Sequence, residues 1–314
     1  MKKLWFLCLS MTVLLLGGCN LVEGINSSNE SEENSASEDH NDNQSNPDDV
    51  YVPVQEYTGD GYTLANGKET DLIANENRDV VEDAVKQFFQ EEYKTEVKVH
   101  QIVGNVDGAT VFVESVGEPH FYTYAIVPID KANESIRTDK VWSQEAAVED
   151  AISAGIYGKV QEEKFHNLTT LIENVAKQYN LVGLQDEAIS VGANLYSNEY
   201  YFTSIFDEEP FIKVLNNYLD DPNQTINEWN KMLNIKKLDP NSIGITINLY
   251  MANEGADPDR EAFDQLVKTI EKAKNIPKGN YAIFLHDNLI NKKRASGSKD
   301  NSLRKSTPEE IIKE

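Results

Sequence analysis

One cysteine near the start of the chain carries the clearest chemistry in the sequence. Cys19 follows Gly18 and a mostly apolar stretch, residues 4–16, which two lysines precede. A positive start, an apolar stretch of this length and small residues before a cleavage point are typical of a secretory signal. A cysteine at that point can form a thioether with diacylglycerol, after which a peptidase cuts between Gly18 and Cys19. The pattern predicts a signal peptide over residues 1–18 and lipidation of Cys19.

Two alternatives to a lipid anchor stay open at this point. An ordinary secretory signal can end near a cysteine by coincidence, and a transmembrane helix can begin with a similar apolar run. Residues 4–16 are, however, shorter than the roughly 20 residues that span a bilayer, and the chain from Asn20 onward is polar. Two acyl chains hold a protein stably on a membrane. We therefore expect the lipid bilayer as a partner through acylated Cys19, on the extracytoplasmic face of the cell membrane.

The number of cysteines excludes several other kinds of chemistry. The chain has two cysteines, and Cys8 lies in the predicted signal peptide. The mature chain then keeps Cys19 alone. This excludes a disulfide framework, a thiolate metal site and a cysteine nucleophile.

Two histidines form the other candidate site. His100 and His120 lie on neighbouring predicted strands, with Glu114 and Glu118 close in the chain. Two imidazoles and a carboxylate can bind a transition metal, so His100 and His120 are a candidate metal or polar site. Their spacing matches no established metal motif, and half-exposed strand positions are the alternative. We predict no metal and no cofactor.

Common signatures of catalysis are missing from the sequence. The chain has no G-x-S-x-G elbow, Walker loop or G-x-G-x-x-G pattern. Serine, histidine and aspartate can still meet in space, because a triad needs no fixed order in the chain. The sequence therefore favours a binding or interaction module. An envelope hydrolase acting on glycan or peptide, or a solute-binding protein of a transporter, is the alternative.

The charge of the chain argues against nucleic acid as a partner. The sequence has 53 acidic and 29 basic residues, a formal net charge of −24. Removing residues 1–18 removes two lysines, so the mature chain has 27 basic residues and a charge of 27 − 53 = −26. Such a surface repels nucleic acid and anionic headgroups. An envelope protein or glycan is the expected kind of partner.

An acidic linker is predicted behind the anchor. Residues 20–49 are rich in Ser, Asn, Glu and Asp, and no Lys or Arg occurs between Lys3 and Lys68. Such a segment has too little apolar surface to fold. We expect residues 19–49 to form the lipid anchor and a disordered linker, with a span of roughly 30 Å. The alternative, calcium binding by its acids, needs convergent ligands.

Residues 50–140 are predicted to form an α+β region. Apolar residues at three- and four-residue steps predict a helix over Arg78–Tyr93. Three strands are expected to follow, at residues 97–103, 110–116 and 121–129, with tight turns between them. The pattern predicts one helix packed on an antiparallel meander. A cystatin-like module shares this outline, which implies no activity.

Residues 141–290 are predicted to be a helical middle followed by a mixed α/β layer. Ser143 is the expected cap of a first helix that Gly155 and Gly158 break, and a second helix ends near Asn180. Strands are expected at residues 200–206, 243–251 and 281–285, with helices between them and a capping box at residues 225–228. After Asn288 the pattern fades. Residues 291–314 are predicted to be a disordered basic tail.

Three further stretches resemble a known family. They are residues 56–62 (EYTGDGY), 104–109 (GNVDGA) and 117–122 (GEPHFY). Together with the leader, they are similar to a family of uncharacterised lipoproteins of Gram-positive bacteria, catalogued as domain of unknown function 1672. The resemblance covers most of the predicted folded part. It implies a cell-membrane lipoprotein and assigns no activity to any residue.

Overall fold

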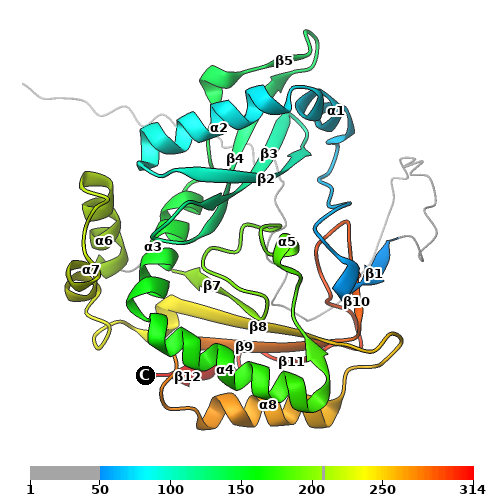
Figure 1. Cartoon of the computed structure of the whole chain (residues 1–314), viewed down its shortest axis with the longest axis vertical. Helices are drawn as coiled ribbons and strands as arrows, with labels where there is room; N and C mark the ends of the chain where they lie inside the picture. The colour runs from blue at the N-terminus through cyan, green and yellow to red at the C-terminus, as the bar shows by residue number, and fades with distance from the viewer. Residues whose placement is uncertain (1–49, 207–208) are drawn as a thin grey trace, which may run out of the picture. The chain divides into compact units, whose positions relative to one another are not determined.

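Residues 50–206 and 209–314 are described by a computed structural model, shown in Figure 1. The predicted signal peptide (1–18), the cleavage and lipidation site at Gly18 and Cys19, and the predicted linker (19–49) lie outside the described residues. The fold is α+β, as the sequence predicts. In the described part of the chain, no helix combines the length and the apolar character needed to cross a bilayer.

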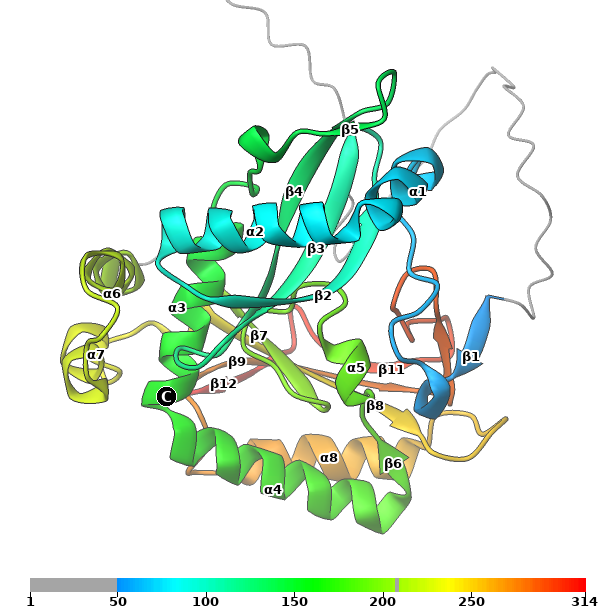
Figure 2. The same ribbon diagram turned by 45° about the horizontal axis from the view of Figure 1, so that its top comes forward.

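The first sheet has the strand order β2-β3-β4-β5, and each neighbouring pair is antiparallel. Its strands are β2 (Val97–Gly104), β3 (Gly108–Ser115), β4 (Tyr122–Asp130) and β5 (Ser135–Ile136). Helix α2 (Arg78–Tyr93) crosses one face of this sheet (Figures 1 and 2). Val81, Val85 and Phe89 form its buried side. The predicted helix on an antiparallel meander is therefore confirmed.

The second sheet is built around β8, which pairs in parallel with β9. Its strands are β6 (Leu181–Val182), β7 (Tyr201–Ile205), β8 (Ile243–Met251), β9 (Gly279–His286), β11 (Leu303–Lys305) and β12 (Ile311–Lys313). A parallel pair needs a crossover connection, and α8 (Arg260–Lys272) lies between β8 and β9 in the chain. Helices α8 and α4 (Glu162–Tyr179) lie side by side below this sheet in both views (Figures 1 and 2). The predicted mixed layer is present.

The C-terminal segment departs from the prediction. Residues 291–314 were expected to be a disordered basic tail, and this expectation is wrong. Strands β11 and β12 both pair antiparallel with β9 and cover the edge that β8 leaves free. Ile311 is buried, and Lys313 Nζ donates to the carbonyls of Glu271 and Ala273 at the end of α8. The ammonium group of Lys313 is thus used within the fold.

Helix α3 (Ala147–Val160) also differs from the prediction, because it continues through both glycines that were expected to break it. A Cβ at Gly155 would lie 2.6 Å from the carbonyl oxygen of His120. A Cβ at Gly158 would lie 2.4 Å from the ring of Tyr196. The two glycines therefore allow other segments to approach the helix closely. Glycine has a low helix propensity, but the packing at these two positions outweighs it. The helix begins four residues after the expected cap, Ser143.

The remaining elements connect and cover the two sheets. They are β1 (Tyr51–Pro53), α1 (Lys68–Glu76), α5 (Asp186–Ile189), α6 (Glu209–Asp220), α7 (Ile226–Leu233), β10 (Leu289–Asn291) and 3₁₀ turns at Val54–Glu56, Thr138–Lys140 and Pro240–Ser242. The predicted capping box opens α7: Thr225 accepts from the Glu228 N–H, and the Glu228 side chain accepts from the Thr225 N–H. One continuous hydrophobic core contains residues from most of the described chain, the first being Ile73 and the last Ile311. The predicted regions 50–140 and 141–290 therefore share their hydrophobic core.

Candidate functional site

The structure brings the two candidate histidines together on one glutamate. His100 lies on β2, His120 lies just before β4, and Glu114 of β3 lies between them. His100 Nε2 is 2.8 Å from Glu114 Oε2, and His120 Nδ1 is 3.9 Å from Glu114 Oε1. The ring of Tyr122 packs against both imidazoles, with centroid distances of 6.4 and 5.2 Å. This half-buried cluster is the one that the sequence singles out.

A β-bulge places His100 in this cluster. Val99 pairs with Val113 and Ile102 pairs with Val111, so two residues of β2 face the single residue between them on β3. A bulge bends its strand and redirects a side chain, and bulges are frequent beside functional sites. Periodicity alone does not reveal this shift in register.

Among the described residues, no group of three or more His, Cys, Asp or Glu side chains is arranged to hold a metal ion. Glu118, the other nearby acid, pairs with Lys159 at 3.0 Å instead. The hydrogen bond between His100 and Glu114 joins neighbouring strands, so its immediate effect is to hold β2 against β3.

A surface pocket lies between α3 and α6. Its volume is about 240 Å³. Apolar walls come from β7 and α6, through Ile205, Phe211 and Leu215. The opposite wall is acidic and comes from the start of α3 and the turn before it, through Glu145, Glu149 and Asp150. None of the residues that line the pocket is basic. The pocket therefore combines apolar and anionic surface.

Glu149 is the most unusual side chain in this pocket. Its Oε1 accepts a hydrogen bond from the Tyr93 hydroxyl at 3.1 Å. Its Oε2 is buried and has no hydrogen-bond partner in the described structure. Buried polar atoms are nearly always hydrogen-bonded, so each exception needs an explanation. The carboxylate of Glu149 in the acidic wall is therefore only partly hydrogen-bonded.

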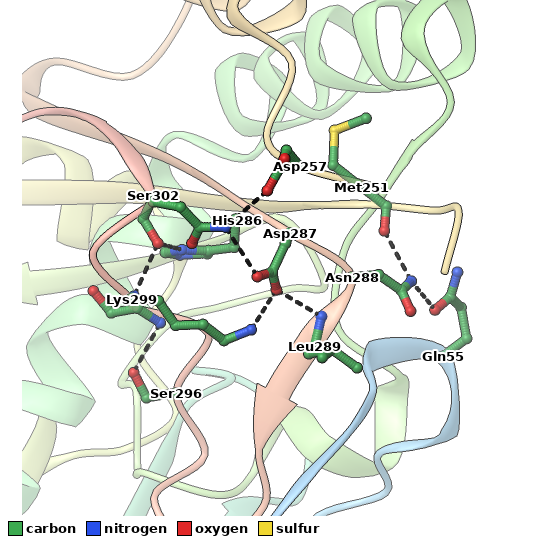
Figure 3. Close-up of polar contacts among 12 residues, drawn as sticks. Gln55, Met251, Asp257, His286, Asp287, Asn288, Leu289, Ser296, Lys299 and Ser302 are labelled. Atoms are coloured by element: carbon green, nitrogen blue, oxygen red, sulfur yellow. Dashed lines mark hydrogen bonds and ion pairs between the residues drawn. The ribbon is translucent and has the colours of Figure 1, made fainter. Parts of the chain in front are cut away.

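A second polar network, which sequence reasoning missed, surrounds the end of β9 (Figure 3). His286 is 3% exposed. Its Nδ1 lies 2.9 Å from Ser302 Oγ, and its Nε2 lies 3.4 Å from Asn248 Oδ1. Because Nε2 faces an acceptor, it carries the proton, and Nδ1 accepts from the Ser302 hydroxyl. The network joins β9, β8 and the C-terminal segment.

Asp287, the next residue, is held by three donors (Figure 3). Its carboxylate accepts from Lys299 Nζ at 2.5 Å, from the Leu289 N–H at 2.9 Å and from Asn301 Nδ2 at 3.3 Å. Burial raises the pKa of this carboxyl, but the three donors outweigh it and hold the pKa below its usual range. The ammonium of Lys299 also lies 4.8 Å from the Tyr51 ring centroid. These contacts fasten the C-terminal segment and β1 to the sheet.

The state of His286 predicts a pH dependence of stability. Burial lowers the pKa of His286 from 6.5 to about 4. Well above pH 6.5 the imidazole is neutral in the folded and the unfolded chain and has no effect on stability. Below that pH the unfolded chain takes up a proton that the folded protein excludes. The free energy of unfolding should therefore fall by about 2 kcal/mol between about pH 7.5 and about pH 5.

Urea unfolding at both pH values checks this prediction. In His286→Gln the part of the pH dependence due to this side chain should vanish, since glutamine does not titrate in this range. His166→Gln is the matched control, because His166 is exposed, and it should keep the dependence of the wild type. An identical pH dependence in the wild type and His286→Gln would contradict the assignment.

The sequence contains weak signals for what was missed. Two of the three acids of the pocket, Glu149 and Asp150, fall in the first turn of α3, where they suit the positive end of the helix dipole. They are therefore easily interpreted as helix-start residues alone. The run His286, Asp287 and Asn288 directly follows a predicted strand, which is a common position for functional polar residues. No pattern in the sequence connects this run with Ser302 or Lys299.

The fold and a comparison with known sequences place the chain in a protein family. The described domain is α+β, with two larger sheets that share a core, a two-stranded sheet of β1 and β10, and a small pocket of apolar and acidic surface. The chain belongs to the DUF1672 family of proteins of unknown function, whose sequence model matches residues 44–313. The family resemblance expected from the sequence is thereby confirmed.

A solved structure of the same family has a similar fold. The crystal structure of a DUF1672 family protein from Staphylococcus aureus subsp. aureus Mu50 matches with a TM-score of 0.68. The two chains are 19% identical, and the match covers 84% of this chain and 98% of the other. At this identity the likeness concerns the fold alone. No curated protein matched the chain.

Proposed function

We propose that the protein is a lipoprotein, acylated on Cys19 and held on the extracytoplasmic face of the cell membrane, whose folded domain is a binding module. The leader of residues 1–18 and the single cysteine of the mature chain support the anchor. The charge of −26 on the mature chain, from 27 − 53, argues against nucleic acid as the partner. The proposed extracytoplasmic position makes an envelope protein or glycan the proposed partner.

The pocket between α3 and α6 is the observation that carries the binding role. Its apolar walls and acidic rim are the combination by which proteins recognise other molecules, because apolar contact supplies affinity and placed polar groups supply orientation. The described chain begins at β1, which pairs with β10. In both views β1 and β10 lie on the opposite side of the described domain from α6 (Figures 1 and 2). The described residues next to the proposed tether therefore lie away from the pocket.

Photo-cross-linking in living cells tests the binding role. A photoactivatable residue at Ile212, which lines the pocket and is 51% exposed, should give an adduct with an envelope component. The same residue at Val80, which is 46% exposed on α2, is the matched control and should give none. Equal adducts at both positions, or none at either, would contradict a binding role for this pocket.

The hydrolase alternative makes a different prediction. The mature chain, purified in detergent, should not turn over a panel of glycan, peptide and phosphoester substrates faster than its Glu114→Gln and Glu149→Gln variants. These two variants alter the histidine cluster and the pocket. Turnover that is lost in either variant would replace the binding role with catalysis.

A further inference from the structure

We propose that the pocket between α3 and α6 binds one basic side chain, an arginine or a lysine, displayed by a partner protein. The inference rests on the proposed binding role and goes further, because it names the chemical group that the pocket accepts. Size, wall chemistry, charge and the surroundings of the pocket each contribute to it.

The size of the pocket favours a single side chain. Pockets for whole small-molecule ligands typically have volumes of about 300–1,000 Å³. At about 240 Å³ this pocket is smaller. It has room for one long side chain that enters from an approaching surface. The ligand is therefore expected to be part of a larger molecule.

The walls match the two parts of a basic side chain. Lysine and arginine carry a charged head on an aliphatic stem, and the stem packs favourably along apolar surface. Phe211 and Leu215 of α6 and Ile205 of β7 supply such surface. The acids from the start of α3 lie on the opposite wall of the same pocket. A stem along α6 would bring the charged head to α3.

The unpartnered oxygen of Glu149 points to a hydrogen-bond donor as ligand. The positive end of the α3 dipole accounts for acids in its first turn. It does not account for Glu149 Oε2, which is buried without a hydrogen-bond partner in the described structure. Leaving such an acceptor unpaired costs free energy, and a hydrogen bond between charged groups is among the stronger ones. A guanidinium or ammonium group in the pocket supplies the opposite charge, and it becomes the missing donor once the Glu149 side chain, which lines the pocket, turns Oε2 toward it.

Exposed apolar residues beside the pocket favour a protein partner over a free amine. Ile212, on the pocket wall, is 51% exposed, and Phe206, which follows the pocket residue Ile205, is 56% exposed. A small hydrophilic cation would gain nothing from these side chains. In protein interfaces, by contrast, an anchoring arginine is commonly surrounded by apolar contacts that exclude water. The two features together fit a basic anchor residue on a partly apolar protein surface.

A binding titration with matched peptides tests the inference. The mature chain in detergent is titrated with a fluorescent peptide that carries one arginine between leucines, and with the same peptide carrying citrulline, which is neutral and of similar shape. The arginine peptide should bind about tenfold more tightly or better, the ratio expected for a hydrogen bond between charged groups. Glu149→Gln should lose about tenfold in affinity for the arginine peptide and little for the citrulline peptide.

Two further variants separate this site from general attraction. Glu163→Gln removes one negative charge from the exposed surface of α4, outside the pocket, and should bind like the wild type. Glu145→Gln removes an exposed acid of the pocket and should weaken the arginine peptide even if Glu149→Gln proves unstable in a melting experiment. Equal binding of the two peptides, or equal weakening by Glu163→Gln and Glu145→Gln, would overturn the inference.

The two experiments distinguish a failure of the basic side-chain assignment from a failure of the binding role itself. If the arginine peptide shows no preference but Ile212 still cross-links selectively, the pocket binds a partner through another group, and only the assignment of a basic side chain fails. If neither peptide binds and no cross-link forms at Ile212, both proposals fail.

Discussion

Gly104→Ala is expected to lower the free energy of unfolding by about 3 kcal/mol or more. A Cβ on Gly104, at the end of β2, would lie 2.1 Å from the Gly67 carbonyl oxygen and 2.2 Å from the Asp71 amide nitrogen. Both are backbone atoms, so no side chain can rotate away. The Gly104 N–H also donates to Asp71 Oδ1 at 2.9 Å. Relief of the overlap would therefore displace α1 from the edge of the first sheet.

Urea unfolding of Gly104→Ala beside Gly244→Ala measures this effect. A Cβ on Gly244, in the middle of the second sheet, would meet Ser204 Cβ at 3.4 Å, an ordinary contact. Gly244→Ala should therefore change stability by no more than about 1 kcal/mol, in part because alanine restricts the unfolded chain. A Gly104→Ala protein as stable as Gly244→Ala would show that α1 does not pack against β2 as described.

Cys19→Ala is expected to abolish lipid attachment completely. The proposed thioether forms on the cysteine sulfur, and the peptidase acts on the lipidated form, so the variant should carry no fatty acid and should keep residues 1–18. Cells grown with an alkyne-labelled fatty acid report the first effect, and the electrophoretic mobility of the protein reports the second. The retained apolar leader can itself hold the chain on the membrane, so these two readouts are more informative than membrane association.

Cys8→Ala is the matched control for that experiment. Cys8 is the other cysteine of the chain and lies within the apolar part of the leader. Its loss should leave both the lipid label and the mobility of the mature protein unchanged. A label that survives in Cys19→Ala, or that disappears in Cys8→Ala, would refute acylation at Cys19.

Elements with strong periodicity were predictable from the sequence. Helix α2 and strand β8 coincide with the residues predicted, Arg78–Tyr93 and Ile243–Met251. Both have a regular apolar face, and local turn or cap residues mark their ends. The capping box at Thr225 was predictable for the same reason, since its two hydrogen bonds involve residues three apart. Local sequence signals were therefore sufficient to predict the main helices and strands of the α+β fold.

Long-range pairing limited the rest of the prediction. Strands β11 and β12 have three residues each and owe their conformation to the free edge of β9, which no local pattern reveals. Gly155 and Gly158 have low helix propensity, yet α3 continues through them because the His120 backbone and Tyr196 need the space. In both cases tertiary contacts outweighed the local preference.

The candidate site was only partly accessible from the sequence. The proximity of His100 and His120 followed from placing them on neighbouring strands, and the structure joins both to Glu114. The pocket could not be predicted in this way. Its apolar wall on α6 and its acidic wall at α3 come from segments about 60 residues apart in the chain, from Glu149 to Phe211. The two walls become neighbours only when α3 packs against α6.

We propose that this domain stands on the outer face of the cell membrane. Protease treatment of protoplasts from cells that produce the wild-type chain tests it most directly. The protein should sediment with the membranes, and protease added outside should degrade residues 50–314, while a cytoplasmic marker protein stays intact. Recovery of the protein in the cytoplasmic fraction, or its protection until the protoplasts are lysed, would contradict the account.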